Sequence, residues 1–249
     1  MTQTPCLGIP FDDGSPEELL EKAFCLIGLD RAAYIVTPNP EIVLAAGKDP
    51  ALREAILRAD LILPDGVGLM WASRILGTPI RHRLPGIDFA SLLLAKLAKR
   101  KGSVFLLGAR PGVAGLAGDK LAQRYPGLRI AGTHHGYYSP DEEAALLDEI
   151  RQSGTDLLLV CLGSPSQELW MQKHRADLPG VLMIGLGGAL DVYSGNIRRA
   201  PMRWRGLGLE WLWRLLQEPK RIKRVIRLPG ILRAAMTEKG RKKRWKKEN

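Results

Sequence analysis

The chain of 249 residues is 45% hydrophobic and 25% charged, with a formal net charge of +11, and this length is enough to close one sizeable core, or one core with an appendage. Because apolar residues recur along the chain, the composition excludes a largely disordered, collagen-like or coiled-coil protein. Three scattered cysteines, Cys6, Cys25 and Cys161, do not make a disulfide framework and are typical of reduced thiols in a cytosolic compartment.

The N-terminal segment lacks the pattern of a targeting signal. Residues 1–16 contain no basic region followed by an apolar one, so we expect no signal peptide. No window of about 18 apolar residues occurs anywhere in the sequence, which argues against a bilayer-spanning segment. Any association with a membrane is therefore expected to be peripheral.

Between residues 34 and 184, short apolar runs alternate with segments of helical periodicity. The runs that predict strands are residues 34–36, 61–63, 104–107, 128–130, 157–160 and 181–184. The segments that predict helices are residues 41–46, 50–59, 69–76, 87–100, 113–125, 141–153 and 167–174. This alternation predicts an α/β fold, a Rossmann-like parallel sheet with helices on both faces. The continuously apolar strands fit a sheet that is buried on both sides.

The composition changes near residue 195, which divides the chain into a predicted core (1–195) and a C-terminal helical, basic appendage (196–249). From Arg198 to the end there are 18 basic and 4 acidic residues, against 19 and 22 in the preceding part. Residues 204–217 contain three tryptophans and five leucines, and Leu209, Leu212, Trp213 and Leu216 recur at helical spacing. We expect Pro219 to break or restart the helix and Pro229 to interrupt it again. Such an amphipathic cationic segment favours a membrane surface, a nucleic acid or a phosphorylated substrate as partner. A solvated charged face or an oligomer interface is the alternative.

Polar residues and glycines follow the predicted strands, at the edge where doubly wound sheets bind ligands. The candidates are Thr37 and Asn39 after the first strand, Asp65 after the second, the turn 108–112 after the third, Gln167 after the fifth, and Gly187, Gly188 and Asp191 after the sixth. Asp65 at a strand end can serve as a general base, but an aspartate there is equally suited to capping a helix. Each of the other turns can likewise be part of a ligand site or only a structural turn between a strand and a helix.

Several familiar catalytic patterns are absent from the sequence. It has no dinucleotide-binding glycine fingerprint, no Walker A motif and no nucleophile elbow, and its four histidines lack metal-ligand spacing with cysteines or carboxylates. No two aspartates are two positions apart, so a metal-binding Asp-x-Asp pair is missing. We therefore expect no metal and no cofactor, and cationic side chains such as Arg81 and Arg83 to neutralise any diphosphate leaving group.

Five motifs, in this order along residues 34–220, together resemble the WecG/TagA/CpsF family of bacterial glycosyltransferases, and most closely its TagA branch. They are Thr37-Pro38-Asn39, Leu63-Pro64-Asp65-Gly66-Val67-Gly68, Arg83-Leu84-Pro85-Gly86, Gly163-Ser164-Pro165-Ser166-Gln167-Glu168 and Gly185-Leu186-Gly187-Gly188-Ala189-Leu190-Asp191. The resemblance implies an inverting, metal-independent transfer of N-acetylmannosamine from its UDP donor to the 4-hydroxyl of undecaprenyl-diphosphate-linked N-acetylglucosamine. That reaction belongs to the synthesis of teichoic acid-type cell-wall polymers.

The resemblance also implies a role for each candidate residue. Asp65 is the expected base, Thr37 and Asn39 hold sugar hydroxyls, Arg83 and Gln167 line the same pocket, and Gly187, Gly188 and Asp191 meet the nucleotide. The appendage docks on the membrane, completes the active site and brings Arg214, Arg221 and Arg224 to the diphosphate. The protein is then expected to be cytoplasmic and peripheral on the inner face of the cell membrane.

Three alternatives stay open at this point. The donor can be another UDP-hexose used in surface polysaccharide synthesis. The basic tail can bind nucleic acid, although its basic residues are interleaved with apolar ones, and we expect no nucleic acid partner. A dinucleotide-dependent oxidoreductase is disfavoured by the glycine spacing. The core can also form a homo-oligomer.

Overall fold

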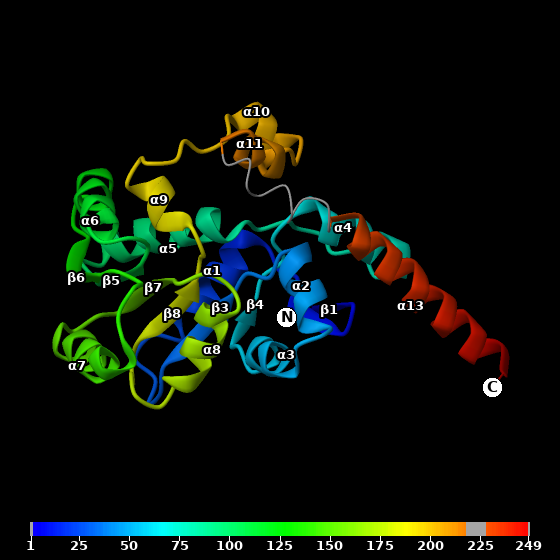
Figure 1. Cartoon of the computed structure of the whole chain (residues 1–249), viewed down its shortest axis with the longest axis horizontal. Helices are drawn as coiled ribbons and strands as arrows, with labels where there is room; N and C mark the ends of the chain where they lie inside the picture. The colour runs from blue at the N-terminus through cyan, green and yellow to red at the C-terminus, as the bar shows by residue number, and fades with distance from the viewer. Residues whose placement is uncertain (1, 218–227, 249) are drawn as a thin grey trace.

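The computed structural model, which describes residues 2–217 and 228–248, has at its centre a six-stranded sheet in the order β4-β3-β8-β7-β5-β6 (Figure 1). All neighbouring strands run parallel. The strands are β3 (Ala33–Val36), β4 (Leu61–Ile62), β5 (Ser103–Gly108), β6 (Arg129–His134), β7 (Leu157–Cys161) and β8 (Leu182–Gly185). Each predicted strand is thus confirmed, and so is the parallel arrangement.

Helices cover both faces of this sheet, as predicted. The connecting helices are α2 (Pro40–Ala46), α3 (Pro50–Leu57), α4 (Val67–Leu76), α5 (Gly86–Lys99), α6 (Val113–Arg124), α7 (Glu143–Gln152), α8 (Ser166–Lys173) and α9 (Ala189–Tyr193), with a 3₁₀ turn η1 (Pro140–Glu142) before α7. Strand side chains alternate between two hydrophobic clusters: in β3, Ile35 packs with α5 and α6, whereas Tyr34 packs with α3 and α8. This period of two explains why the strands are apolar throughout.

The N-terminal segment holds structure that the sequence patterns did not predict. A hairpin of β1 (Gln3–Cys6) and β2 (Ile9–Asp12) is followed by α1 (Pro16–Phe24). Ser15 and Glu18 form a reciprocal capping box at the start of α1, and the hairpin is fastened to the sheet where the Ile62 amide donates to Asp12. These segments therefore extend the core toward the N-terminus.

The appendage contains α10 (Met202–Gly206), α11 (Glu210–Gln217) and α13 (Leu228–Glu248). The helical spacing of Leu209, Leu212, Trp213 and Leu216 is confirmed in α11, which the turn at Gly208, with a φ of +74°, separates from α10. Pro229 lies in the first turn of α13, where a missing N–H breaks no helical hydrogen bond. Residues 218–227, which include Pro219, lie outside the described residues.

Helix α13 packs along α4 and α2 (Figure 1). Its Ile231 and Ala235 are fully buried in the same cluster as Leu69 of α4. Over the residues that the structure describes, no helix is both long and apolar enough to cross a membrane.

Candidate active site

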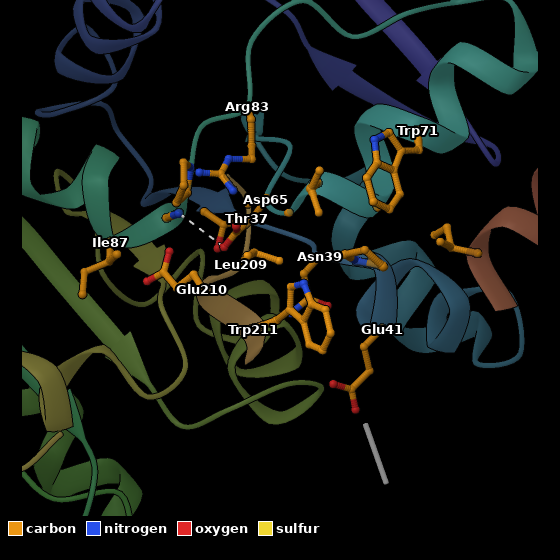
Figure 2. A pocket seen from close by; sticks show the side chains of 18 of the residues that line it. Thr37, Asn39, Glu41, Asp65, Trp71, Arg83, Ile87, Leu209, Glu210 and Trp211 are labelled. Atoms are coloured by element: carbon orange, nitrogen blue, oxygen red, sulfur yellow. Dashed lines mark hydrogen bonds between the residues drawn. The ribbon is translucent and has the colours of Figure 1, made fainter. Parts of the chain in front are cut away.

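A cavity of about 550 Å³ lies where the core meets the appendage (Figure 2). Its core wall comes from the segments that follow β3, β4 and β8, together with the loop before α5. Its other wall comes from the segment between α10 and α11, Trp211 of α11, and the first turn of α13. The lining includes Thr37, Asn39, Glu41, Asp65, Val67, Trp71, Arg83, Ile87, Leu186, Ala189, Leu207, Leu209, Glu210, Trp211, Pro229, Ile231 and Leu232.

Asp65 faces this cavity from the loop between β4 and α4. The loop is held by hydrogen bonds from the Leu63 amide to Val36 and from the Leu84 amide to Pro64. Asp65 does not cap the helix, because the residue at the N-cap of α4 is Gly66. One carboxylate oxygen of Asp65 instead lies 3.5 Å from the Gly86 amide (dashed line in Figure 2). A half-buried carboxylate held in a cavity wall can accept a proton from a bound hydroxyl.

Thr37 lies beside Asp65 and is buried. Its hydroxyl donates to the Gly185 carbonyl at 3.0 Å, which leaves the oxygen lone pairs free to accept a hydrogen bond from a ligand. The backbone of α5 approaches Thr37 so closely that a Cβ on Gly86 would lie 2.7 Å from the threonine hydroxyl. Glycine at position 86 is therefore required for Thr37 and the start of α5 to share this wall.

Asn39 combines the two explanations that the sequence left open. Its amide oxygen accepts from the Ile42 amide at 3.0 Å and so caps α2. Its amide nitrogen is not used by that cap, and Asn39 also lines the cavity. The residue can therefore donate a hydrogen bond to a ligand while its rotamer is fixed by the cap.

Arg83 connects the core to the appendage. Its guanidinium lies in the cavity wall near Asp65 (Figure 2) and donates to the Arg205 carbonyl of α10 at 2.9 Å. A guanidinium has five N–H donors, so this contact leaves donors for an anionic ligand.

The appendage wall contributes residues that the sequence patterns did not single out. Glu210 pairs with Arg199 at 3.4 Å, and Arg199 pairs with Asp88 of α5 at 2.7 Å. Burial lowers the pKa of Arg199, but the two carboxylates outweigh that effect and the pKa is raised overall. This chain of charges fastens α10 and α11 to the core. Its partners are far apart in sequence, so no local pattern indicated them.

The cavity is chemically divided. Figure 2 shows Arg83, Asp65, Thr37 and Glu210 in one part of it, and the indole rings of Trp71 and Trp211 in another, with Asn39 between the indoles and Glu41 beyond Trp211. Both indoles are partly exposed, at 51% and 37%. Trp71 and Trp211 belong to helices α4 and α11, so their helical spacing alone predicted only packing. The arrangement fits a ligand with a polar, anionic end and an apolar end.

The remaining predicted residues lie outside the cavity lining. Gln167, predicted to line the same pocket as Arg83, is buried, with 3% of its surface exposed, and it accepts a hydrogen bond from the Gly187 amide. Gly187 and Gly188 form the turn from β8 into α9, and Asp191 is half-buried in α9. The flanking Leu186 and Ala189 do line the cavity.

The three predicted tail arginines cannot be placed against the cavity. Arg221 and Arg224 lie outside the described residues, and for Arg214 only the backbone, within α11, is described.

The chain is similar to known glycosyltransferases. A family model described as "Glycosyl transferase WecG/TagA/CpsF family" matches residues 4–245. A Bacillus spizizenii protein is 38% identical over 207 residues, covering 83% of this chain and 80% of the relative. A Staphylococcus aureus protein is 37% identical over 225 residues, covering 90% and 88%, and a Bacillus subtilis protein is 36% identical over 211 residues, covering 85% and 82%. All three are named N-acetylglucosaminyldiphosphoundecaprenol N-acetyl-beta-D-mannosaminyltransferase.

Proposed function

The chain belongs to the WecG/TagA/CpsF family of glycosyltransferases, and from that premise we propose that it transfers N-acetylmannosamine from UDP-N-acetylmannosamine to N-acetylglucosamine on undecaprenyl diphosphate. The observation that carries this proposal is the divided cavity, in which Asp65, Thr37 and Arg83 meet an apolar wall shared by core and appendage. The acceptor has the same division, with a sugar diphosphate at one end and a polyprenyl chain at the other. The reaction is a step in the synthesis of a teichoic acid-type cell-wall polymer.

The chemistry is a single inverting displacement. Asp65 takes the proton of the acceptor 4-hydroxyl as its oxygen forms a bond to the anomeric carbon of the donor sugar. The bond between that carbon and the diphosphate oxygen breaks at the same time, and its electron pair leaves with UDP. Thr37 and Asn39 hold the sugar hydroxyls by accepting and donating hydrogen bonds, respectively, which fixes the attack geometry.

The leaving diphosphate requires compensating positive charge as its bond to the sugar breaks. Arg83 is one source, because its guanidinium lines the cavity and the contact with Arg205 fixes its orientation. We assign the same role to Arg214, Arg221 and Arg224, and the nucleotide contacts to Gly187, Gly188 and Asp191. These assignments depend on the family resemblance.

The appendage is the part we propose to dock on the anionic inner face of the membrane, as a peripheral contact. Large apolar side chains are exposed there, notably Met202, Leu207 and Leu216, which are 77%, 72% and 64% exposed. They adjoin a segment with many basic residues, a combination that binds anionic lipid surfaces. Nucleic acid binding by the tail is not favoured, because it leaves the cavity and its lining without a role.

The full-length protein in detergent, incubated with a panel of UDP-sugars and a short-chain lipid-diphosphate N-acetylglucosamine acceptor, tests the proposal by UDP release. We expect release only with both substrates present, fastest with UDP-N-acetylmannosamine, and unchanged by EDTA. Equal rates with all donors would contradict the assigned donor, and loss of activity in EDTA would contradict a metal-independent displacement.

A further inference from the structure

A buried carboxyl group with no role in the reaction above lies directly behind the cavity wall. Gln167 and Glu168, at the start of α8, are 3% and 1% exposed. Glu168 Oε1 accepts a hydrogen bond from Gln167 Nε2 at 2.9 Å, and Gln167 Oε1 accepts one from the Gly187 amide at 2.8 Å. The contacts therefore run in series from Glu168 through Gln167 to Gly187.

The partners at both ends determine the orientation of the Gln167 amide. A backbone N–H only donates, so the amide must turn its oxygen toward Gly187. Its NH₂ group then points the other way and requires an acceptor in a region closed to water. Glu168 supplies that acceptor. Without it, the amide loses the contact that distinguishes its two possible orientations.

The segment held in this way is a wall of the cavity. Gly187 lies between Leu186 and Ala189, which both line the cavity. On the opposite side of the segment, the Thr37 hydroxyl donates to the Gly185 carbonyl. Gln167 also packs against Gly185 so closely that a Cβ there would lie 2.9 Å from Nε2. The turn is thus fixed from two sides, by Thr37 and by Gln167.

We propose that Glu168 is a positioning residue, which acts by orienting the Gln167 amide and thereby holds the 185–189 segment in the conformation that binds the donor. The expected effect on donor kinetics rests on the proposed function, whereas the expected effect on the conformation of the 185–189 segment does not. Burial raises the pKa of the Glu168 carboxyl, so this position favours an uncharged acceptor over a charged one. A neutral amide at position 168 is therefore expected to preserve the arrangement.

The test compares four variants and one control variant of the full-length protein. Glu168→Met removes the acceptor at similar volume, and Glu168→Gln retains an oxygen acceptor. Gln167→Ala is made alone and together with Glu168→Met. Met171→Leu is the matched control, because Met171 also packs on Gly185 but makes no hydrogen bond to the segment. Two readouts are measured, the steady-state constants for the UDP-sugar and the hydrogen–deuterium exchange of the peptide containing Gly187.

Losing one buried hydrogen bond is expected to lower kcat/KM for the donor about tenfold in Glu168→Met, with the acceptor KM unchanged. Exchange at Gly187 should become faster, Glu168→Gln and Met171→Leu should behave like the parent, and the double variant should be no worse than Gln167→Ala. If Glu168→Met does not fold, Glu168→Asp, whose carboxyl is withdrawn by one methylene, takes its place with the same expected losses.

Three outcomes would overturn the proposal. They are losses that multiply in the double variant, a Glu168→Gln variant as impaired as Glu168→Met, and unchanged exchange at Gly187. If the parent protein releases no UDP with any donor, the proposed function fails, and the exchange measurement still decides the role of Glu168.

Discussion

In the proposed reaction, Asp65 is the residue on which the chemistry depends most directly. Its carboxylate lines the cavity, and the helix cap that it was equally suited to make is not formed. Asp65→Asn keeps the shape but cannot accept a proton, so we expect transfer to fall by about two to four orders of magnitude, the usual contribution of a general base. UDP binding, measured by calorimetry, should be unchanged. The exposed Asp119→Asn on α6 is the control, and substantial turnover by Asp65→Asn would rule out its role as the base.

A second prediction concerns Glu168 and the pH dependence of the stability of the folded protein. Because burial raises the pKa of this carboxyl in the folded protein, the folded state holds the proton to higher pH than the unfolded chain does. Its contribution to stability therefore falls as the pH rises above the ordinary glutamate value. Glu168→Gln removes that dependence, so its melting temperature relative to the parent should increase from pH 4 to pH 8. A constant difference across this range would contradict the buried acid.

The sequence predicted the place of individual candidate residues where a strand end fixes it. Thr37, Asn39 and Asp65 follow β3 and β4 and all line the cavity, because parallel strands bring their carboxyl ends to one edge. Arg83 lies in the loop between α4 and α5, so only the family resemblance placed it in the same pocket. Gln167 follows β7 at the same edge but is buried against Gly187, because strand order says which edge a residue occupies but not where its side chain points.

Among the secondary-structure elements, one aspartate contributes two ion pairs to the attachment of α10 and α11. Asp88 of α5 pairs with both Arg199 and Arg205, at 2.7 and 3.7 Å. Asp88→Asn should loosen these helices by about 1–2 kcal/mol, between the values for exposed and buried ion pairs. Faster proteolytic cleavage within residues 196–217 is the expected readout.

The control for Asp88→Asn neutralises an aspartate of an exposed ion pair elsewhere in the molecule. Asp148→Asn breaks a surface contact with Arg151 on α7, which is far from the appendage, and cleavage should stay at the parent rate. Equal cleavage of Asp88→Asn and the parent would show that the ion pairs of Asp88 do not hold α10 and α11.

The strands and helices from β3 onward and the helical character of the appendage were predictable, but the way the appendage is held to the core was not, for a physical reason. Core strands and helices carry the periods of two and 3.6 that a buried sheet imposes. The appendage is held by pairs such as Asp88 and Arg199, 111 positions apart, and by the turn at Gly208. Periodicity contains no information about either.

For the molecule as a whole, the two hydrophobic clusters belong almost entirely to the core. Of the residues described in the appendage, only Ile231 and Ala235 are buried members of a cluster. Deleting residues 196–249 should therefore leave a folded but nearly inactive protein, because the cavity loses its second wall. Circular dichroism and UDP release measure the two properties. Full turnover by the truncated protein would show that the core alone forms the site.

The division of charge leads to a last prediction. The part before Arg198 is nearly neutral, whereas the remainder holds 18 basic and 4 acidic residues. Attraction to an anionic surface must therefore come from the appendage. It amounts to about 1 kcal/mol for each basic residue close to the surface. The full-length protein should float with phosphatidylglycerol vesicles but not with phosphatidylcholine vesicles, and the chain without residues 196–249 with neither. High salt should weaken the binding only in part, because exposed side chains such as Met202 and Leu207 insert without charge. Complete release by salt would mean that charge alone holds the protein, and flotation of the truncated chain would place the membrane contact in the core.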